Sequence, residues 1–254
     1  MKILITNDDS IHAKGLKNLV EVAVEFGEVI VVAPEQPQSA KSHSISLEKP
    51  ITYKKSNIFG DNVEAYYVSG TPADCVKLAI NNLLPEKPDL LLSGINHGDN
   101  TSVNLLYSGT VAGAVEGAMH DIPSLALSLA SHDPEADFTG ANHYIKKVIE
   151  FALEVSKSKP LCLNVNVPDI PLKEIKGIRI VKQAKGAWFE EFEKIPHPNK
   201  NANYFWLTGK YVNFEPENTD NDVWSIQNGY VSIVPLKIDF TNEVIYNEFK
   251  DYKF

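Results

Sequence analysis

Short apolar runs of strand length alternate with segments of helical periodicity over the first two thirds of the chain, and this alternation restricts the fold more than any other feature. Lys2 to Thr6 predicts a buried strand, Gly15 to Glu25 gathers its apolar residues on one helical face, and Glu28 to Ala33 predicts the next strand. A strand, a helix and a strand in this order form a βαβ unit, which requires a parallel sheet covered by helices. The predicted fold class is therefore α/β.

The alternation continues as far as Val167. Thr71 is a good N-cap residue, Pro72 suits the first helical position and Asp74 can complete a capping box, so a helix is predicted to run to about Leu84. The other predicted helices span residues 108–119 and 141–156. The other predicted strands span residues 51–54, 64–68, 88–94, 122–129 and 161–167. The strands at 51–54 and 64–68 are predicted to form a hairpin with Gly60 in its turn.

Beyond Pro168 the periodicity loosens into short predicted strands. Proline and asparagine crowd between Pro196 and Asn203, and a final strand is predicted near Tyr230 to Pro235. A chain of 254 residues is long enough for one large α/β domain. We therefore interpret residues 1–168 as the core of a single domain over residues 1–254. Residues 169–254 are predicted to be a β-rich extension, with an oligomerisation arm and segments that return to the core.

The charge balance narrows the possible partners. The net charge is −9, whereas binding to a polynucleotide or an anionic membrane needs a concentrated cationic face. Arg179 is the single arginine, so no cluster of guanidinium groups can hold an anionic substrate. A phosphate would need lysine, backbone N–H groups, a helix N-terminus or a bound cation to neutralise its charge. We expect neither a polynucleotide nor a membrane as partner.

The two cysteines, Cys75 and Cys162, lie inside apolar runs, which is typical of buried thiols in a reducing compartment. Two thiols also exclude a four-cysteine zinc site. The chain enters its first predicted strand without an apolar leader, and no later apolar run approaches the ~20 residues that cross a bilayer. These features predict a cytoplasmic protein.

Polar residues gather in three loops that follow predicted strands, where open α/β sheets bind ligands. The loops span residues 6–10, 36–46 and 93–100. In the first loop the adjacent carboxylates of Asp8 and Asp9 can converge, and a cation would relieve their repulsion. Oxygen ligands favour Mg²⁺ or Mn²⁺ over zinc. The pair alone leaves a second interpretation open, in which both acids cap the following helix and remain solvated.

The third loop and the helix after it could contact a phosphate. The glycine-rich sequence from Ser93 to Gly98 lets the backbone approach a ligand, and the helix beginning at Ser108-Gly109-Thr110 has free N–H groups. Ser108 is also a common N-cap residue, and taken alone it favours that structural role. Among the loop histidines, His97 is the one to test as a base, although a single loop histidine is more often a surface residue.

Several enzyme classes lose support because their motifs are absent. No Gly-x-Gly-x-x-Gly follows the first strand and no Gly-x-x-x-x-Gly-Lys-Ser/Thr occurs, so dinucleotide and P-loop sites are not indicated. The Gly-x-Ser-x-Gly signal of serine hydrolases is also missing. The Asp-x-Asp spacing of phosphoaspartate enzymes does not follow the first strand.

Six motifs follow one another along the chain. They are Ile5-Thr6-Asn7-Asp8-Asp9, Val32-Ala33-Pro34 with Gln38-Ser39, Gly70-Thr71-Pro72-Ala73-Asp74-Cys75-Val76, Ser93-Gly94-Ile95-Asn96-His97-Gly98, Tyr107-Ser108-Gly109-Thr110-Val111 and Leu163-Asn164-Val165-Asn166-Val167-Pro168. In this order they closely resemble the SurE family, the stationary-phase survival protein E nucleotidases. Gly229-Tyr230-Val231-Ser232 with Pro235-Leu236 is similar to a late motif of that family, so the likeness extends to about residue 236.

The resemblance implies a Rossmann-like, three-layer, mostly parallel sheet and a phosphoric monoester hydrolase of the 5′-nucleotidase or acid phosphatase type. Its substrates would be nucleoside 5′- and 3′-monophosphates, its cofactor one divalent ion per subunit, Mg²⁺ or Mn²⁺, and its assembly a homodimer or homotetramer formed by exchange of C-terminal segments. The resemblance places the metal ligands on Asp8, Asp9, Ser39 and Asn96. The expected catalytic residues are Asp8, Asp9 and Asn96, and the expected substrate-binding residues are Asn7, Ser39, Gly94, Ser108, Gly109 and Thr110.

Two residues depart from the family pattern. The family usually has glycine after the acidic pair and after the ligand serine, where this chain has Ser10 and Ala40, and either change could alter loop geometry or substrate preference. An unliganded edge of Asp8 or Asp9 is our hypothesis for the group that accepts the proton of the attacking water. The alternatives are an exopolyphosphatase and a protein that binds a nucleotide or metal without turning it over.

Overall fold

The computed structural model describes residues 1–156, 161–196 and 203–253. Within these residues one sheet has nine strands in the order β3-β4-β2-β1-β5-β6-β7-β13-β8. Its strands are β1 (Lys2–Thr6), β2 (Glu28–Pro34), β3 (Tyr53–Ser56), β4 (Glu64–Val68), β5 (Leu90–His97), β6 (Ser124–Leu129), β7 (Cys162–Val167), β8 (Ile178–Ile180) and β13 (Val231–Pro235). The six strands from β4 to β7 in this order are parallel, whereas β3 and β13 run antiparallel to their neighbours β4 and β7.

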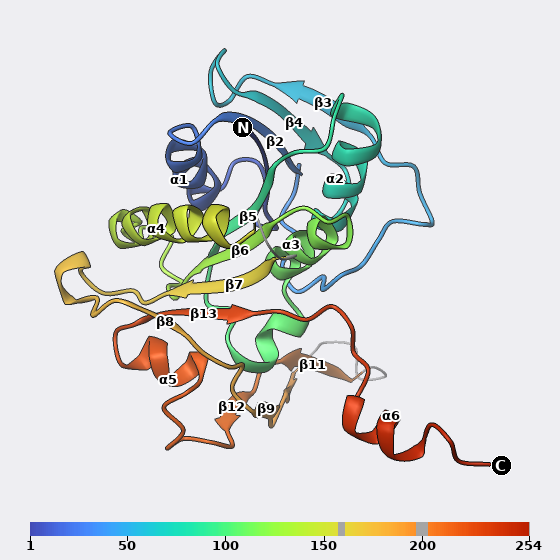
Figure 1. Ribbon diagram of the computed structural model, residues 1–254, viewed down its shortest axis with the longest axis vertical. Coiled ribbons are helices and arrows are strands. Elements are labelled where there is room, and N and C mark those ends of the chain that lie inside the picture. The colour runs from blue at the N-terminus through green and yellow to red at the C-terminus, as the bar shows by residue number, and fades with distance from the viewer. Residues whose placement is uncertain (157–160, 197–202, 254) are drawn as a thin grey trace.

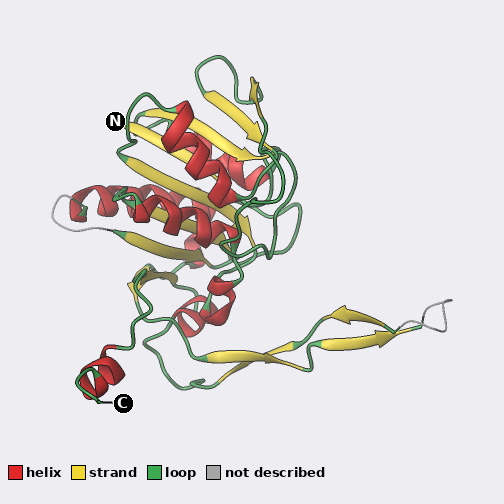
Figure 2. Ribbon diagram, turned by 90° about the vertical axis from the view of Figure 1, so that its right-hand side faces the viewer, coloured by secondary structure: helices red, strands yellow, loops and turns green. Residues whose placement is uncertain are grey.

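Helices cover both faces of this sheet, as Figures 1 and 2 show. The longer helices are α1 (Lys14–Ala23), α2 (Pro72–Leu78), α3 (Gly109–Met119), α4 (Thr139–Val155), α5 (Asp222–Gln227) and α6 (Glu243–Phe249). Short helical segments are η1 (Ala79–Leu83), η2 (Ser102–Leu106) and η3 (Leu172–Glu174). The predicted α/β class with three layers is therefore confirmed. Within the described ranges, no helix combines the length and the apolarity needed to cross a membrane.

The side chains of β1 alternate between two apolar cores. Ile3 and Ile5 pack in the cluster that contains the buried residues of α1 and α4, whereas Leu4 packs in the cluster that contains the buried residues of α2. A central parallel strand is buried on both faces, which explains why the sequence of β1 is continuously apolar rather than alternating.

The strand order places the ligand site of the sheet. From β1 the chain continues to β2 on one side, and it later returns as β5 on the other side. Such a reversal opens a crevice at the carboxyl ends of the two central strands. The crevice lies between the loop after β1 and the end of β5, and these two segments carry three of the four predicted metal ligands.

The end of β5 differs from the prediction. The predicted strand stops at Gly94, but β5 continues to His97 through a shift of register against β6. Gly94 has a φ of +139°, and an added Cβ would lie 2.2 Å from the carbonyl oxygen of Leu127. Gly94 is therefore required for close packing inside the sheet, and the predicted glycine-rich turn is instead an irregular continuation of the strand.

A second difference concerns the helix that starts after Thr71. The capping box of Thr71 and Asp74 is present, with Pro72 in the first turn, as predicted. The α-helix ends at Leu78, however, and the chain continues to Leu83 as a π-helix rather than as the single predicted helix.

Residues after 168 form two kinds of structure. Strands β8 and β13 join the main sheet, and β13 pairs with β7. Two further antiparallel pairs, β9 (Gly186–Phe189) with β12 (Lys210–Asn213) and β10 (Phe192–Ile195) with β11 (Tyr204–Leu207), form a ribbon that projects from the body in Figure 2. We call this ribbon, residues 186–213, the arm. Much of the predicted proline- and asparagine-rich stretch, residues 197–202, lies outside the described residues.

Candidate active site

Asp8 lies against the first turn of α3. Its carboxylate accepts a hydrogen bond from the hydroxyl group of Thr110 at 2.5 Å, and its carbonyl oxygen accepts one from the N–H of Gln38 at 2.7 Å. An added Cβ on Gly109 would lie 2.8 Å from the Cβ of Asp8, so glycine permits this close approach. The side chain faces a helix N-terminus, which favours its negative charge. The residue is only 3% exposed, however, and burial opposes that charge.

Asp9 joins the same loop to the end of β5. Its Oδ2 accepts a hydrogen bond from the backbone N–H of His97 at 3.2 Å. The neighbouring residue, Asn96, donates its Nδ2 to the carbonyl oxygen of Gly98 at 2.7 Å. This hydrogen bond fixes the orientation of the Asn96 amide group. The Oδ1 of Asn96 is then the atom suited to coordinate a cation.

Three of the four predicted metal ligands line one cavity, which we call the Asp8 cavity. Asp8, Ser39 and Asn96 reach it from the loops after β1 and β2 and from the end of β5, and the cavity volume is about 500 Å³. This volume lies within the range of small-molecule sites, roughly 300–1,000 Å³. The lining residues are Asp8, Ser39, Ala40, Asn96, His97, Asn100, Asn104, Tyr107, Ser108, Trp188, Glu191, Leu207 and Thr208.

The paired carboxylates are electrostatically unfavourable as they stand. Burial, followed by the negative charge of Asp9, raises the pKa of Asp8 from 3.8 to about 6, although the hydrogen bond from Thr110 partly opposes this shift. Burial also raises the pKa of Asp9. Among the described residues, no lysine, arginine or histidine forms an ion pair with either carboxylate. A bound cation would supply the missing counter-charge.

The donor atoms fit a hard divalent ion. Ligands from two carboxylates, a serine hydroxyl and an asparagine amide are all oxygen atoms, which suit Mg²⁺ or Mn²⁺. The described part of the chain contains no group of three or more His, Cys, Asp or Glu side chains placed to hold a metal ion. A metal centre at this cavity therefore depends on Ser39 and Asn96 as well as on the two acids.

The residues at the start of α3 that were predicted to contact the phosphate differ in their position relative to the cavity. Ser108 lines the cavity, and it is also the N-cap of α3, because its Oγ accepts a hydrogen bond from the N–H of Val111 at 3.1 Å. Gly109 and Thr110 lie behind Asp8 rather than in the cavity wall. The hydroxyl group of Thr110 is thus committed to Asp8.

Two other predicted substrate residues do not line the cavity. Asn7 is fully buried and donates its Nδ2 to the carbonyl oxygen of Ser10 at 2.8 Å, so it holds the loop that carries the acidic pair. Gly94 lies inside the sheet against Leu127. His97 does line the cavity, but its ring packs edge-on against Phe138 at 5.2 Å and its Nε2 is buried without a partner among the described residues.

Sequence reasoning missed one whole side of the cavity. Trp188, Glu191, Leu207 and Thr208 come from the arm and lie at least 80 residues after the other lining residues. The motifs of the core gave no signal for them, because the periodicity of a short strand does not reveal where a projecting ribbon is rooted. The one available hint was the aromatic content of the arm.

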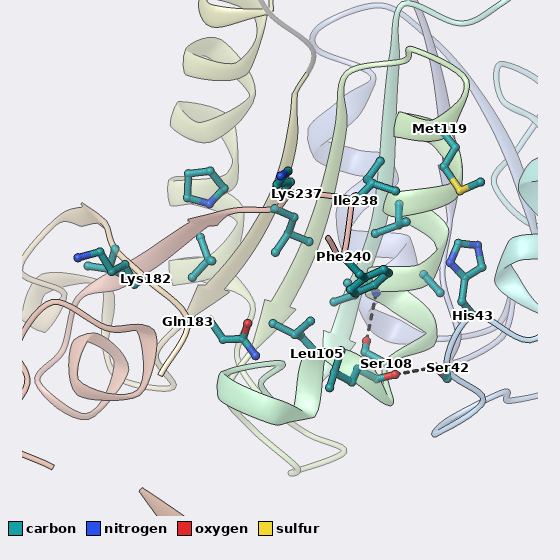
Figure 3. Close-up of a pocket in the computed structure, with 18 residues that line it drawn as sticks. Ser42, His43, Leu105, Ser108, Met119, Lys182, Gln183, Lys237, Ile238 and Phe240 are labelled. Carbon is teal, nitrogen blue, oxygen red and sulfur yellow. Dashed lines mark hydrogen bonds between the residues drawn. The ribbon is translucent and has the colours of Figure 1, made fainter. Parts of the chain in front are cut away.

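A second cavity of about 770 Å³ lies beside α3 (Figure 3) and is lined mainly by apolar side chains of that helix and of the segment after β13. His43, another loop histidine, borders this second cavity. Its Nε2 lies 2.8 Å from Glu116, a buried acid of α3 that also pairs with Lys77 at 2.7 Å and with His120 at 3.4 Å. His43 therefore belongs to an ion-pair cluster outside the Asp8 cavity.

Comparisons with known proteins give one consistent result. The family model described as "Survival protein SurE" matches residues 3–190. The chain is 43% identical to "5'-nucleotidase SurE" of Phocaeicola vulgatus, over 98% of this chain and 96% of that protein. It is 45% identical to the protein of the same name from Flavobacterium psychrophilum, over 94% and 92%. The crystal structure of the Sure protein from Aquifex aeolicus matches with a TM-score of 0.83 and 33% identity, over 98% of each chain.

Proposed function

Because this chain belongs to the Survival protein SurE family, we propose that it is a nucleotidase that hydrolyses nucleoside 5′- and 3′-monophosphates to nucleoside and phosphate. The observation that carries the proposal is the division of the Asp8 cavity. Its floor at the strand ends presents oxygen ligands for a metal ion that would bind the phosphate, whereas its arm side presents Trp188 and Leu207. A nucleoside monophosphate has the same division into a charged end and a flat, weakly polar end.

We assign the metal to Asp8, Asp9, Ser39 and Asn96, with one Mg²⁺ or Mn²⁺ per subunit. The raised pKa of Asp8 and the absence of ion pairs to the acids in the described residues support this assignment. When bound, a divalent ion of this kind polarises a phosphoryl oxygen and activates water for attack.

The protein's own groups position and neutralise the phosphoryl group. Thr110 orients Asp8 through its hydroxyl group. The amide of Asn96 and the hydroxyl group of Ser108, which both line the cavity, would stabilise the equatorial oxygens, in place of the arginine cluster that this chain lacks. An edge of Asp8 or Asp9 that is not bound to the metal would accept the proton of the attacking water.

Phosphate release tests this function directly. We expect release from AMP and GMP with Mg²⁺ or Mn²⁺ and none with EDTA, whereas release only from polyphosphate, or nucleotide binding without release, would contradict the proposal. Asp9→Asn should abolish turnover while the unfolding transition stays close to that of the wild type. Asp61→Asn, in the exposed β3–β4 turn, is the matched control and should retain activity. Near-normal activity of Asp9→Asn would refute the role of Asp9.

We also propose a homodimer or homotetramer in the cytoplasm. The arm exposes Phe192, Phe205 and Trp206, and α6 leaves the body with Val244 and Phe249 exposed. Exposed apolar surface of this extent marks protein contacts. Both cysteines are free and buried, in agreement with a reducing compartment.

A further inference from the structure

We propose that Trp188 is the platform on which the nucleobase stacks. This inference rests on the proposed nucleotidase function and adds the residue that recognises the base. Trp188 lies on β9 at the root of the arm, and it lines the same cavity as Asp8, Ser39 and Asn96. A nucleotide with its phosphate at the strand ends would therefore direct its base towards the arm side.

Three contacts hold the indole ring of Trp188 in place. Its Nε1 donates a hydrogen bond to Oδ1 of Asn104, in η2, at 2.8 Å. The ring of Tyr211, on β12, lies beside it with ring centroids 6.1 Å apart and the ring planes at 64°. An added Cβ on Gly209 would lie 3.3 Å from Cε3 of the indole, so the backbone also approaches closely there.

These contacts suit a stacking surface. The polar edge of the indole is already satisfied, so the ring does not need a polar partner from the ligand and can offer its face. A ring of fixed orientation loses little conformational freedom when a ligand binds. Every base has a π-face, so stacking tolerates different bases and gains most from the larger purines.

Tyr107 is the other aromatic residue of the cavity, but it differs from Trp188. It is 54% exposed, and no ring contact or side-chain hydrogen bond of Tyr107 is found among the described residues. Of Tyr107 and Trp188, it is Trp188 that contacts among the described residues hold in place.

The competing role for Trp188 is purely structural, as an anchor between the arm and η2. An anchor and a base platform make different predictions for a substrate without a base. Loss of an anchor would disturb the cavity for every phosphate ester. Loss of a platform would weaken only those esters that carry a base.

The test compares AMP with ribose 5-phosphate, which has the same sugar phosphate without the base. We expect Trp188→Ala to raise KM for AMP roughly 5- to 150-fold, the range for base–aromatic stacking, with little change in kcat. KM for ribose 5-phosphate should stay unchanged, and Trp188→Phe should restore most of the affinity for AMP. Equal losses for both substrates, or no loss for AMP, would overturn the proposal.

Trp224→Phe is the matched control. It also removes a tryptophan, but Trp224 lies on α5, stacks on Tyr230 and does not line the cavity. This variant should keep the wild-type KM for both esters, and light scattering should give the same oligomer for all variants.

Tryptophan fluorescence separates this inference from the proposed function, because it needs no turnover. Adenosine should quench the fluorescence of the wild type and of Trp224→Phe, whereas Trp188→Phe should lose most of the quenching. If no nucleotide released phosphate, the proposed function would be refuted, but the quenching experiment would still test the role of Trp188. Equal quenching of wild type and Trp188→Phe, or no quenching of the wild type, would reject Trp188 as the platform.

Discussion

Ser10 and Ala40 adopt left-handed backbone conformations, with φ of +85° and +58°. The SurE resemblance places glycine at both positions, and glycine enters this region without the clash between Cβ and the carbonyl oxygen that other residues suffer. Both residues flank predicted metal ligands, since Ser10 follows Asp9 and Ala40 follows Ser39. This chain therefore keeps the glycine-type geometry of both loops with residues that are less suited to it.

Replacing Ala40 with glycine should relieve this strain. We expect Ala40→Gly to raise the free energy of unfolding by about 0.5–1 kcal/mol, because the clash removed outweighs the entropy that glycine adds to the unfolded chain. Ala118→Gly, inside α3, should lower it by about 1 kcal/mol. Urea unfolding measures both, and a destabilised Ala40→Gly would contradict the assigned strain.

Glu116 makes stability depend on pH. Burial opposes its charge, but hydrogen bonds from His43 and Lys77 outweigh burial and lower the pKa of the carboxyl from 4.5 to about 2. Because the folded pKa is the lower one, the ionised cluster stabilises the fold above the unfolded pKa near 4.5. That stabilisation is lost as the pH falls from there towards 2.

Glu116→Gln should therefore destabilise the protein at neutral pH and not in acid. We expect the free energy of unfolding to fall by about 2 kcal/mol at about pH 7, a value that allows for the solvent that screens Lys77 and His43. The difference from the wild type should shrink below about pH 4.5. Urea unfolding across this range measures it, with the exposed Glu21→Gln on α1 as control. A loss that stays constant down to about pH 3 would contradict the pKa of Glu116.

At the scale of elements, the site is assembled where α3 meets the loop after β1. The polar segments around Asp8, Asn96 and Ser108 could be located from periodicity and capping chemistry, whereas the choice of Ser39 and Asn96 as ligands came from the SurE resemblance. The extension of β5 through Gly94 could not, because it depends on the carbonyl oxygen of Leu127, a contact of the folded sheet. Trp188 could not be placed, because the root of the arm is fixed by contacts with η2.

The contact between α3 and Asp8 gives a prediction of its own. Gly109→Ala would bring a Cβ within 2.8 Å of the Cβ of Asp8, so the acid or the helix must shift. We expect kcat/KM for AMP to fall roughly 10- to 100-fold with little change in the unfolding midpoint. Gly60→Ala is the control for activity. Its φ of +83° disfavours alanine, but the added Cβ meets no atom within 4 Å and Gly60 does not line the cavity, so the variant should keep full activity and lower only the unfolding midpoint. Unchanged activity of Gly109→Ala would show that Asp8 does not need this placement.

At the scale of the whole molecule, the arm projects from the body (Figure 2). Four of its residues also line one side of the cavity. The loose pattern after Pro168 predicted an extension with segments that return to the core. It did not predict which strands they pair with, because pairing between distant strands is set by tertiary contacts. Assembly through the arm would therefore affect the walls of the active site as well as the oligomer.

Removing the exposed aromatic pair of the arm should change the assembly. We expect the double change Phe192→Ser and Phe205→Ser to reduce the mass measured by light scattering and to raise KM for AMP, because the arm that carries Trp188 would be less well supported. A wild-type protein that is monomeric at all concentrations would contradict the proposed oligomer.

The central claim is that oxygen atoms of Asp8, Asp9, Ser39 and Asn96 surround one divalent cation. Anomalous diffraction from a crystal of the protein soaked in Mn²⁺ tests it most directly. The account predicts one strong peak per subunit, about 2.1 Å from oxygen atoms of these four side chains and absent from crystals of Asp9→Asn. A peak at another site, or no peak between Asp8 and Asn96 in a crystal that binds Mn²⁺ elsewhere, would contradict it.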